Sequence, residues 1–235
     1  MPRLFIVIAA PAVLLALVVY WIWTAPDSGE SVAADAPAPT AADAERVFAT
    51  VCSACHGPAG EGKREIGAPS IAALPRWHIL NQLRKFRNGR RGTHEADEGG
   101  HKMRPIALAL DEAMLEPIAD YVQSLPRHYM QNTLGGDPAV GRMVFEERCI
   151  ECHRYNASGE MVFGSPPLTG FPDWWAEQQI AKFRQRILGY DPLDENSAKM
   201  QRVADSLLLD TDARDALAYI ATLAERERRA AEEGE

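Results

Sequence analysis

Two short motifs contain all four cysteines of the chain and share one pattern. Residues 52–56 read Cys-Ser-Ala-Cys-His, and residues 149–153 read Cys-Ile-Glu-Cys-His. Two thiols at this spacing lie on one face of a helical turn, where each can form a thioether with a porphyrin vinyl group, and the histidine that follows can bind the iron. The motifs therefore predict two c-type haems. The predicted attachment residues are Cys52, Cys55, Cys149 and Cys152, and the predicted proximal ligands are His56 and His153.

Two other chemistries use cysteines at this spacing. The four thiols together could form a structural zinc site, and each pair could form a redox-active disulfide. Neither explains why a histidine directly follows the second cysteine in both motifs. Haem attachment is therefore the preferred interpretation, with zinc and dithiol chemistry as the alternatives.

The motifs belong to a tandem repeat with a constant offset. His153 lies 97 residues after His56, and Met200 lies 97 residues after Met103. Other residues that recur at this offset are Val47, Phe48, Gly67, Pro69, Trp77, Gln82, Lys85, Phe86, Arg87 and Gly92, which match Val144, Phe145, Gly164, Pro166, Trp174, Gln179, Lys182, Phe183, Arg184 and Gly189. The pattern indicates a duplication of one unit of roughly 80 residues.

The repeat also indicates the second axial ligand of each iron. The second unit has no histidine after His153, and Met161 follows too closely to reach the opposite haem face. Met200 is therefore the expected distal ligand of the second iron, and Met103 follows for the first by equivalence. Core packing is the alternative role for both methionines. The other candidate ligands of the first iron are His94 and His101.

The order of these segments resembles that of a class I cytochrome c. In the first unit the attachment motif is followed by Gly-Ala-Pro, then by a helix led by Trp77 that ends in Leu-Arg-Lys-Phe-Arg-Asn-Gly, then by Met-Arg-Pro and a closing helix. The tandem form resembles the di-haem cytochrome c4 family over roughly residues 44–224. This resemblance implies an all-α fold of two small domains, each wrapped around one His/Met haem, which pass single electrons in a bacterial periplasm.

The N-terminus departs from the soluble members of that family. Leu4 to Trp23 is an uncharged apolar run of 20 residues, long enough to cross a hydrocarbon core of about 30 Å. Arg3 precedes the run, and Asp27 and Glu30 follow it, which places the N-terminus in the cytoplasm. We therefore expect a transmembrane anchor in the bacterial inner membrane, with the haem domains in the periplasm. A cleaved signal peptide is the alternative.

The rest of the chain divides by composition. The predicted segments are a membrane anchor at 1–23, a disordered Ala/Pro/acidic linker at 24–43, a first cytochrome c domain at 44–126, a connector at 127–139, a second domain at 140–224 and a charged tail at 225–235. Residues 89–100 are expected to form a polar loop that delivers Met103. Asp43 is the expected N-cap of the first helix.

The two units differ in charge. Residues 45–125 carry 11 Lys and Arg against 10 Asp and Glu, whereas residues 140–223 carry 9 against 13. Because positive charge favours the ferrous state, we expect the less acidic first unit to have the higher potential. A basic cluster on the first unit is a second candidate feature, either for steering partners or as a solvated surface. Its members are Arg84, Lys85, Arg87, Arg90 and Arg91.

These features predict an electron carrier that is not itself an enzyme. With histidine and methionine on each iron, no coordination position is open to a substrate. We expect membrane association through the N-terminal helix, and redox partners such as a cytochrome bc complex and a terminal oxidase or reductase. We expect no nucleic acid and no small-molecule substrate. A fixed subunit of a larger oxidoreductase, or an enzyme whose methionine leaves on reduction, are the alternatives.

Overall fold

The computed structural model describes residue 20, residues 37–209 and residues 211–234. The predicted anchor, apart from Tyr20, and residues 24–36 of the predicted linker lie outside this part. Within it, none of the helices combines the length and the apolar character needed to span a membrane. The chain divides after Ala38 into two units, and the second is Pro39–Glu235. The fold below is that of the second unit.

The first half of this unit is helical. Its α-helices are α2 (Ala41–Val47), α3 (Ser53–His56), α4 (Arg76–Arg87), α5 (Glu98–Ala109) and α6 (Leu115–Ser124), and its shorter turns are η1 (Phe48–Cys52), η2 (Arg64–Ile66) and η3 (Glu112–Met114). A capping box between Thr40 and Asp43 starts α2 at Ala41, so the N-cap is Thr40 and not the expected Asp43. The polar loop predicted at residues 89–100 covers residues 89–97, and α5, which contains Met103, begins at Glu98.

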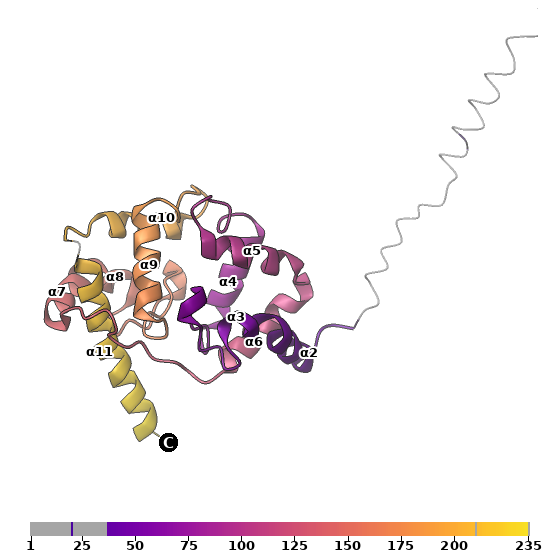
Figure 1. Cartoon of the computed structure of the whole chain (residues 1–235), viewed down its shortest axis with the longest axis horizontal. Helices are drawn as coiled ribbons and strands as arrows, with labels where there is room; N and C mark the ends of the chain where they lie inside the picture. The colour runs from indigo at the N-terminus through magenta and orange to yellow at the C-terminus, as the bar shows by residue number, and fades with distance from the viewer. Residues whose placement is uncertain (1–19, 21–36, 210, 235) are drawn as a thin grey trace, which may run out of the picture. The chain divides into compact units, whose positions relative to one another are not determined.

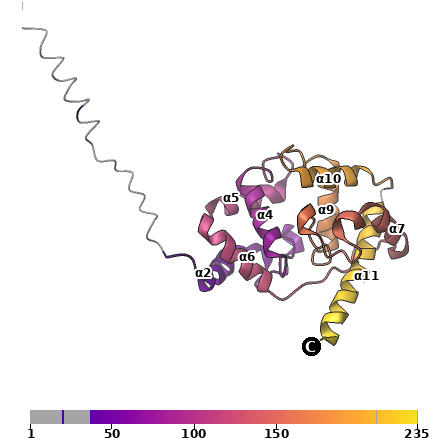
Figure 2. The ribbon, with the colours of Figure 1, turned by 180° about the vertical axis from the view of Figure 1, so that it is seen from behind.

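The second half repeats this order (Figures 1 and 2). Its α-helices are α7 (Pro138–Arg148), α8 (Ile150–His153), α9 (Asp173–Arg184), α10 (Glu195–Asp205) and α11 (Asp212–Glu233), with one 3-10 turn, η4 (Met161–Phe163). Most of the predicted tail continues α11 as a helix. The described residues contain only two isolated β-bridges, Lys63 with Ala68 and Glu160 with Ser165, and no strand. The all-α prediction is confirmed for the described residues.

Each half has its own hydrophobic core. In the first half Phe48 is 1% exposed, and its ring centroid lies 5.2 Å from that of Tyr121. In the second half Phe145 is 0% exposed and lies 5.6 Å from Tyr219. These aromatic pairs occupy equivalent repeat positions and join the first and last helices of each half. The two halves therefore repeat the same core contact between equivalent aromatic residues, in line with the duplication in the sequence.

Two ion pairs with buried aspartates cross between the halves, and they are equivalent by the repeat. Lys85 Nζ on α4 lies 2.8 Å from Asp194 Oδ2, and Lys182 Nζ on α9 lies 2.7 Å from Asp97 Oδ1. Both aspartates also cap helices, because Asp97 accepts from the Gly100 amide at the start of α5, and Asp194 accepts from the Ser197 amide at the start of α10. The interface therefore has an approximate two-fold relation.

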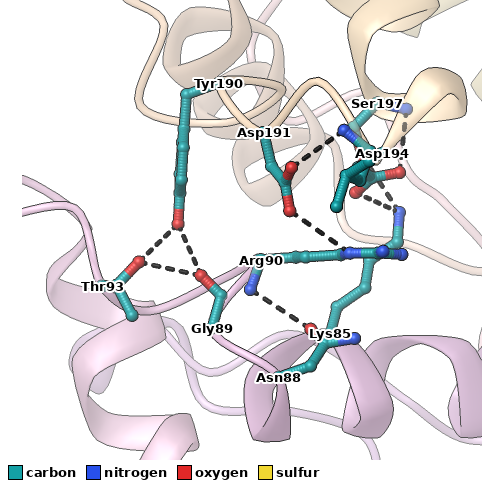
Figure 3. Close-up of polar contacts among 10 residues, drawn as sticks. Lys85, Asn88, Gly89, Arg90, Thr93, Tyr190, Asp191, Asp194 and Ser197 are labelled. Carbon is teal, nitrogen blue, oxygen red and sulfur yellow. Dashed lines mark hydrogen bonds and ion pairs between the residues drawn. The ribbon is translucent and has the colours of Figure 1, made fainter.

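A second group of contacts surrounds the Lys85 pair (Figure 3). The hydroxyl groups of Thr93 and Tyr190 lie 2.5 Å apart, and the Tyr190 hydroxyl also donates to the Gly89 carbonyl at 2.9 Å. Arg90 Nε lies 3.2 Å from Asp191 Oδ2. The two halves are thus joined by polar contacts from the turn after α4 to the turn before α10.

Replacing Asp194 with asparagine is expected to destabilise the protein strongly. Asparagine keeps the helix cap but leaves the Lys85 ammonium buried without its counter-charge. Removing one partner of a buried pair costs about 3 kcal/mol or more. Asp191→Asn is the matched control, because its pair with Arg90 is more exposed, at 22% and 33%, and ion pairs open to solvent contribute about 1 kcal/mol or less. Chemical denaturation of the haem-loaded protein measures both, and equal effects would contradict the assignment.

Candidate haem sites

The two motif histidines are held in the same way. His56 ends α3 and His153 ends α8, and each ring is 7% exposed. His56 Nδ1 lies 2.9 Å from the Pro69 carbonyl oxygen, and His153 Nδ1 lies 3.0 Å from that of Pro166. A carbonyl can only accept, so Nδ1 carries the proton and Nε2 keeps its lone pair. Each imidazole is thereby fixed in the tautomer that binds a metal.

Glycines allow the backbone to bring these carbonyls close. The Gly62 amide donates to the His56 carbonyl at 2.7 Å, and φ at Gly62 is +87°. A Cβ at Gly62 would lie 2.5 Å from the carbonyl carbon of Pro69. Gly159 holds the equivalent place in the second half, with φ of +76°. Only glycine meets both the positive φ and the close approach.

Burial keeps both histidines neutral. It lowers the pKa of His56 below its usual value, against the opposing effect of the hydrogen bond to Pro69. It lowers the pKa of His153 to about 4 for the same reason. A metal ligand must be deprotonated to bind. Both rings are therefore ready to ligate a metal at neutral pH.

The cysteines are free thiols without the properties of a redox pair. Burial, with a smaller contribution from the neighbouring cysteine, raises the pKa of Cys52 to about 11 and that of Cys149 to about 12. Redox-active C-x-x-C pairs depend instead on a lowered thiol pKa. Across the described residues, no three His, Cys, Asp or Glu side chains converge on a common metal position. This geometry favours neither the dithiol nor the zinc alternative.

In the second half the predicted site residues meet at one cavity. Cys149, Cys152, His153 and Met200 all line it. Apolar side chains form much of the remaining wall, namely Leu168, Phe171, Trp175, Ile180, Phe183, Leu188, Val203, Leu217 and Ile220. The structure thus brings together all four residues predicted for the second haem. Trp175, which the sequence analysis did not single out, lines the cavity, whereas Trp174 packs near Arg64.

In the first half Met103 and Cys52 pack against the same hydrophobic core. The rival ligands lie elsewhere: His101 is exposed on α5, and the His94 ring lies 6.1 Å from the Tyr190 ring at the interface. Met103 therefore has the more suitable surroundings for a ligand of a buried haem.

The cavity of the second half is not built by that half alone. Five residues of the first half also line it, namely His78, Gln82, Lys85, Arg90 and Arg91. The sequence showed these arginines as a basic cluster but gave no direction for their side chains. A lone pair on a fixed imidazole, a thioether, two thiols and apolar walls are the donors and surroundings that a c-type haem requires. The residues present fit the group.

The cytochrome c family profile matches residues 41–126 and again residues 139–224. The chain belongs to the cytochrome c family. The two matches together confirm a tandem of two cytochrome c domains, and such a tandem carries two covalently bound haem c groups. The protein is a di-haem electron-transfer cytochrome.

Several known proteins resemble this cytochrome over most of its length. A thiosulfate dehydrogenase electron acceptor of Thiomonas intermedia is 29% identical, over 67% of this chain and 74% of its own. A cbb3-type cytochrome c oxidase subunit FixP of Bradyrhizobium is 30% identical, over 54% of this chain but only 44% of its own. The crystal structure of cytochrome c4 from Pseudomonas stutzeri has a TM-score of 0.59 and 25% identity, covering 78% of this chain and 98% of its own.

Replacing Cys149 and Cys152 together with alanine is expected to halve the covalently bound haem. The remaining contacts of that cavity are non-covalent, so denaturing extraction should remove its haem and leave one haem per chain. Haem content after acid extraction measures this. The double variant Cys52→Ala/Cys55→Ala is the matched control in the first domain and should give the same ratio. Two haems retained after extraction in either variant would refute the assignment.

Proposed function

We propose that this di-haem cytochrome is a membrane-tethered carrier that moves single electrons from a quinol-oxidising complex to a terminal oxidase or reductase. The observation that carries the proposal is the second cavity, where a neutral histidine with a free Nε2 and a methionine thioether line one apolar space. A bound haem supplies reversible one-electron chemistry. The protein's part is to ligate the iron, fix the proximal ring and exclude water.

In this proposal His56 and Met103 ligate the first iron, and His153 and Met200 ligate the second. Cys52 and Cys55 hold the first haem. The equivalent cysteines of the second motif hold the other. Two protein ligands on each iron leave no position for oxygen or peroxide, which favours a carrier over an enzyme. A thioether ligand also favours the ferrous state and raises the potential.

Substitution of the methionines tests the ligand assignment. Wild-type protein should show the far-red sulfur-to-ferric-iron charge-transfer band from both haems. Met103→His and Met200→His should each remove about half of its amplitude per chain, since each replaces one sulfur ligand, and should lower one midpoint potential. Magnetic circular dichroism and redox titration measure both effects. An unchanged band in Met103→His would return His94 or His101 as the first ligand.

The membrane tether rests on the sequence. The apolar run of residues 4–23 is followed by a segment rich in Ala and Pro, with acidic residues. A tether of this kind would hold a carrier near its partners at an effective concentration of order millimolar. The tether therefore supports a shuttle between neighbouring membrane complexes.

A fixed subunit of a larger oxidoreductase is the second candidate. The FixP and CcoP relatives are named as subunits of cbb3-type oxidases. The Thiomonas relative is named as an electron acceptor for thiosulfate dehydrogenase, which favours a dehydrogenase as donor. Both similarities support redox protein partners. The two names differ in one respect: a subunit stays bound to its partner, whereas an electron acceptor can dissociate.

Detergent extraction should separate these two candidates. A shuttle is expected to migrate on size exclusion as a small detergent-bound species, apart from any oxidase or dehydrogenase. A subunit would instead remain with a catalytic chain at constant stoichiometry. Replacing residues 1–36 with a cleavable leader is the accompanying variant, and it should move a two-haem protein into the soluble periplasmic fraction. Retention of that variant in the membrane would contradict the tether.

A further inference from the structure

The cavity of the second domain is lined partly by residues of the first domain. Of the five first-domain residues that line it, three are cations: Lys85, Arg90 and Arg91. Their repeat equivalents in the second domain are Lys182, Ile187 and Leu188. The first domain thus offers two cations at this boundary for which the second domain has no counterpart.

Arg91 differs from the other two cations because no carboxylate partners it. Lys85 pairs with Asp194, and Arg90 pairs with Asp191 (Figure 3). The two Nη groups of Arg91 donate to neutral amides, to Gln82 Oε1 at 2.5 Å and to Gln179 Oε1 at 3.3 Å. Its Nε is buried and has no hydrogen-bond partner. A half-buried guanidinium whose buried Nε–H has no partner can donate to an anion.

A second buried polar side chain lines the same cavity. His78 on α4 is 6% exposed, and its Nδ1 has no hydrogen-bond partner. Its ring centroid lies 6.0 Å from that of Phe171 of the second domain. The repeat equivalent of His78 is Trp175. Two polar side chains of the first domain therefore reach this wall with unused hydrogen-bonding atoms.

The packing of Arg91 fixes its position. Its Cζ lies 4.7 Å from the centre of the Phe86 ring, and its amide donates to the Lys85 carbonyl at 3.1 Å. The turn that carries Arg91 lies between Gly89 and Gly92, whose φ angles are +79° and +75°. The guanidinium is thus held by a tight turn and an aromatic face, not by a flexible surface loop.

We propose that Arg91 of the first domain binds a carboxylate of the haem held by the second domain. The assignment rests on the proposed function, because it takes the cavity of His153 and Met200 as the haem site. Haem carries two negatively charged propionate groups, and the second domain has a net negative charge. A cation from the first domain can therefore neutralise part of the propionate charge. The repeat equivalent of Arg91 is Leu188, which is uncharged. The second domain therefore has no arginine at this position to bind the first haem.

This contact acts against the order of the two potentials that is expected from net charge. Oxidation adds one positive charge to a haem, and a nearby unpaired guanidinium opposes that change. Arg91 therefore raises the potential of the second haem. The net charges of the two domains predict the higher potential for the first haem, because they take no account of a charge that crosses the boundary.

Arg91→Gln tests the proposal in the full-length two-haem protein. It should shift the ferric-to-ferrous equilibrium of the second haem by about tenfold, or about 59 mV for one electron, and should move the first haem less. Arg90→Gln is the matched control, since it removes the same charge from the same cavity but from a residue already paired with Asp191. A shift no larger than in that control, or equal shifts of both haems, would overturn the proposal.

Two further variants keep the result interpretable. Met200→His marks which titration wave belongs to the second haem. If Met200→His shifts neither midpoint potential, the assignment of Met200 as a ligand fails. The Arg91 proposal is still tested in that case, because Arg91→Gln must shift one midpoint potential and not the other. Arg91→Lys keeps the charge, so the fold should survive. It should alter the propionate bending band in resonance Raman spectra, and an unaltered band would also overturn the proposal.

Discussion

The crossed pairs of lysine and aspartate are the constraint on which the arrangement of the two domains depends. One lysine and one aspartate in each repeat produce two bridges, because Lys85 reaches Asp194 and Lys182 reaches Asp97. Burial by itself would raise the pKa of the Asp194 carboxyl, but Lys85 and Ser197 outweigh it and hold that pKa below its usual value. The carboxylates therefore stay charged and complementary. A duplicated unit that already contained both residues needed no new residue to form this contact.

Each bridge also links the interface to a candidate iron ligand. Asp97 caps α5, which contains Met103, and Asp194 caps α10, which contains Met200. The helix that carries each methionine thus begins at a residue held by the opposite domain. Relative movement of the domains would act on the distal side of both haems. The proximal side is independent of the interface, because each histidine is fixed by a proline carbonyl of its own domain.

The sequence was informative where chemistry is local. The two attachment motifs, the offset of 97 residues and the family follow from residue types and spacing. Residues 89–97 form most of the predicted polar loop, and the last three residues of the predicted range belong to α5. The role of Asp97 within this loop was not predicted. In the structure it is 0% exposed, caps a helix and meets Lys182. No pattern within one repeat could reveal that, since the partner of each buried charge lies in the other repeat.

The same reasoning explains where the symmetry of the duplication ends. Residues that must serve both domains alike, such as Lys85 and Lys182, are the same in both repeats. Residues on the wall between one cavity and the opposite domain differ, as Arg91 and Leu188 do. Two identical sites would have similar potentials and give an electron no preferred direction. In our proposal Arg91, which has neither a repeat counterpart nor an ion-pair partner, makes the two sites unequal, while the shared bridges join the domains.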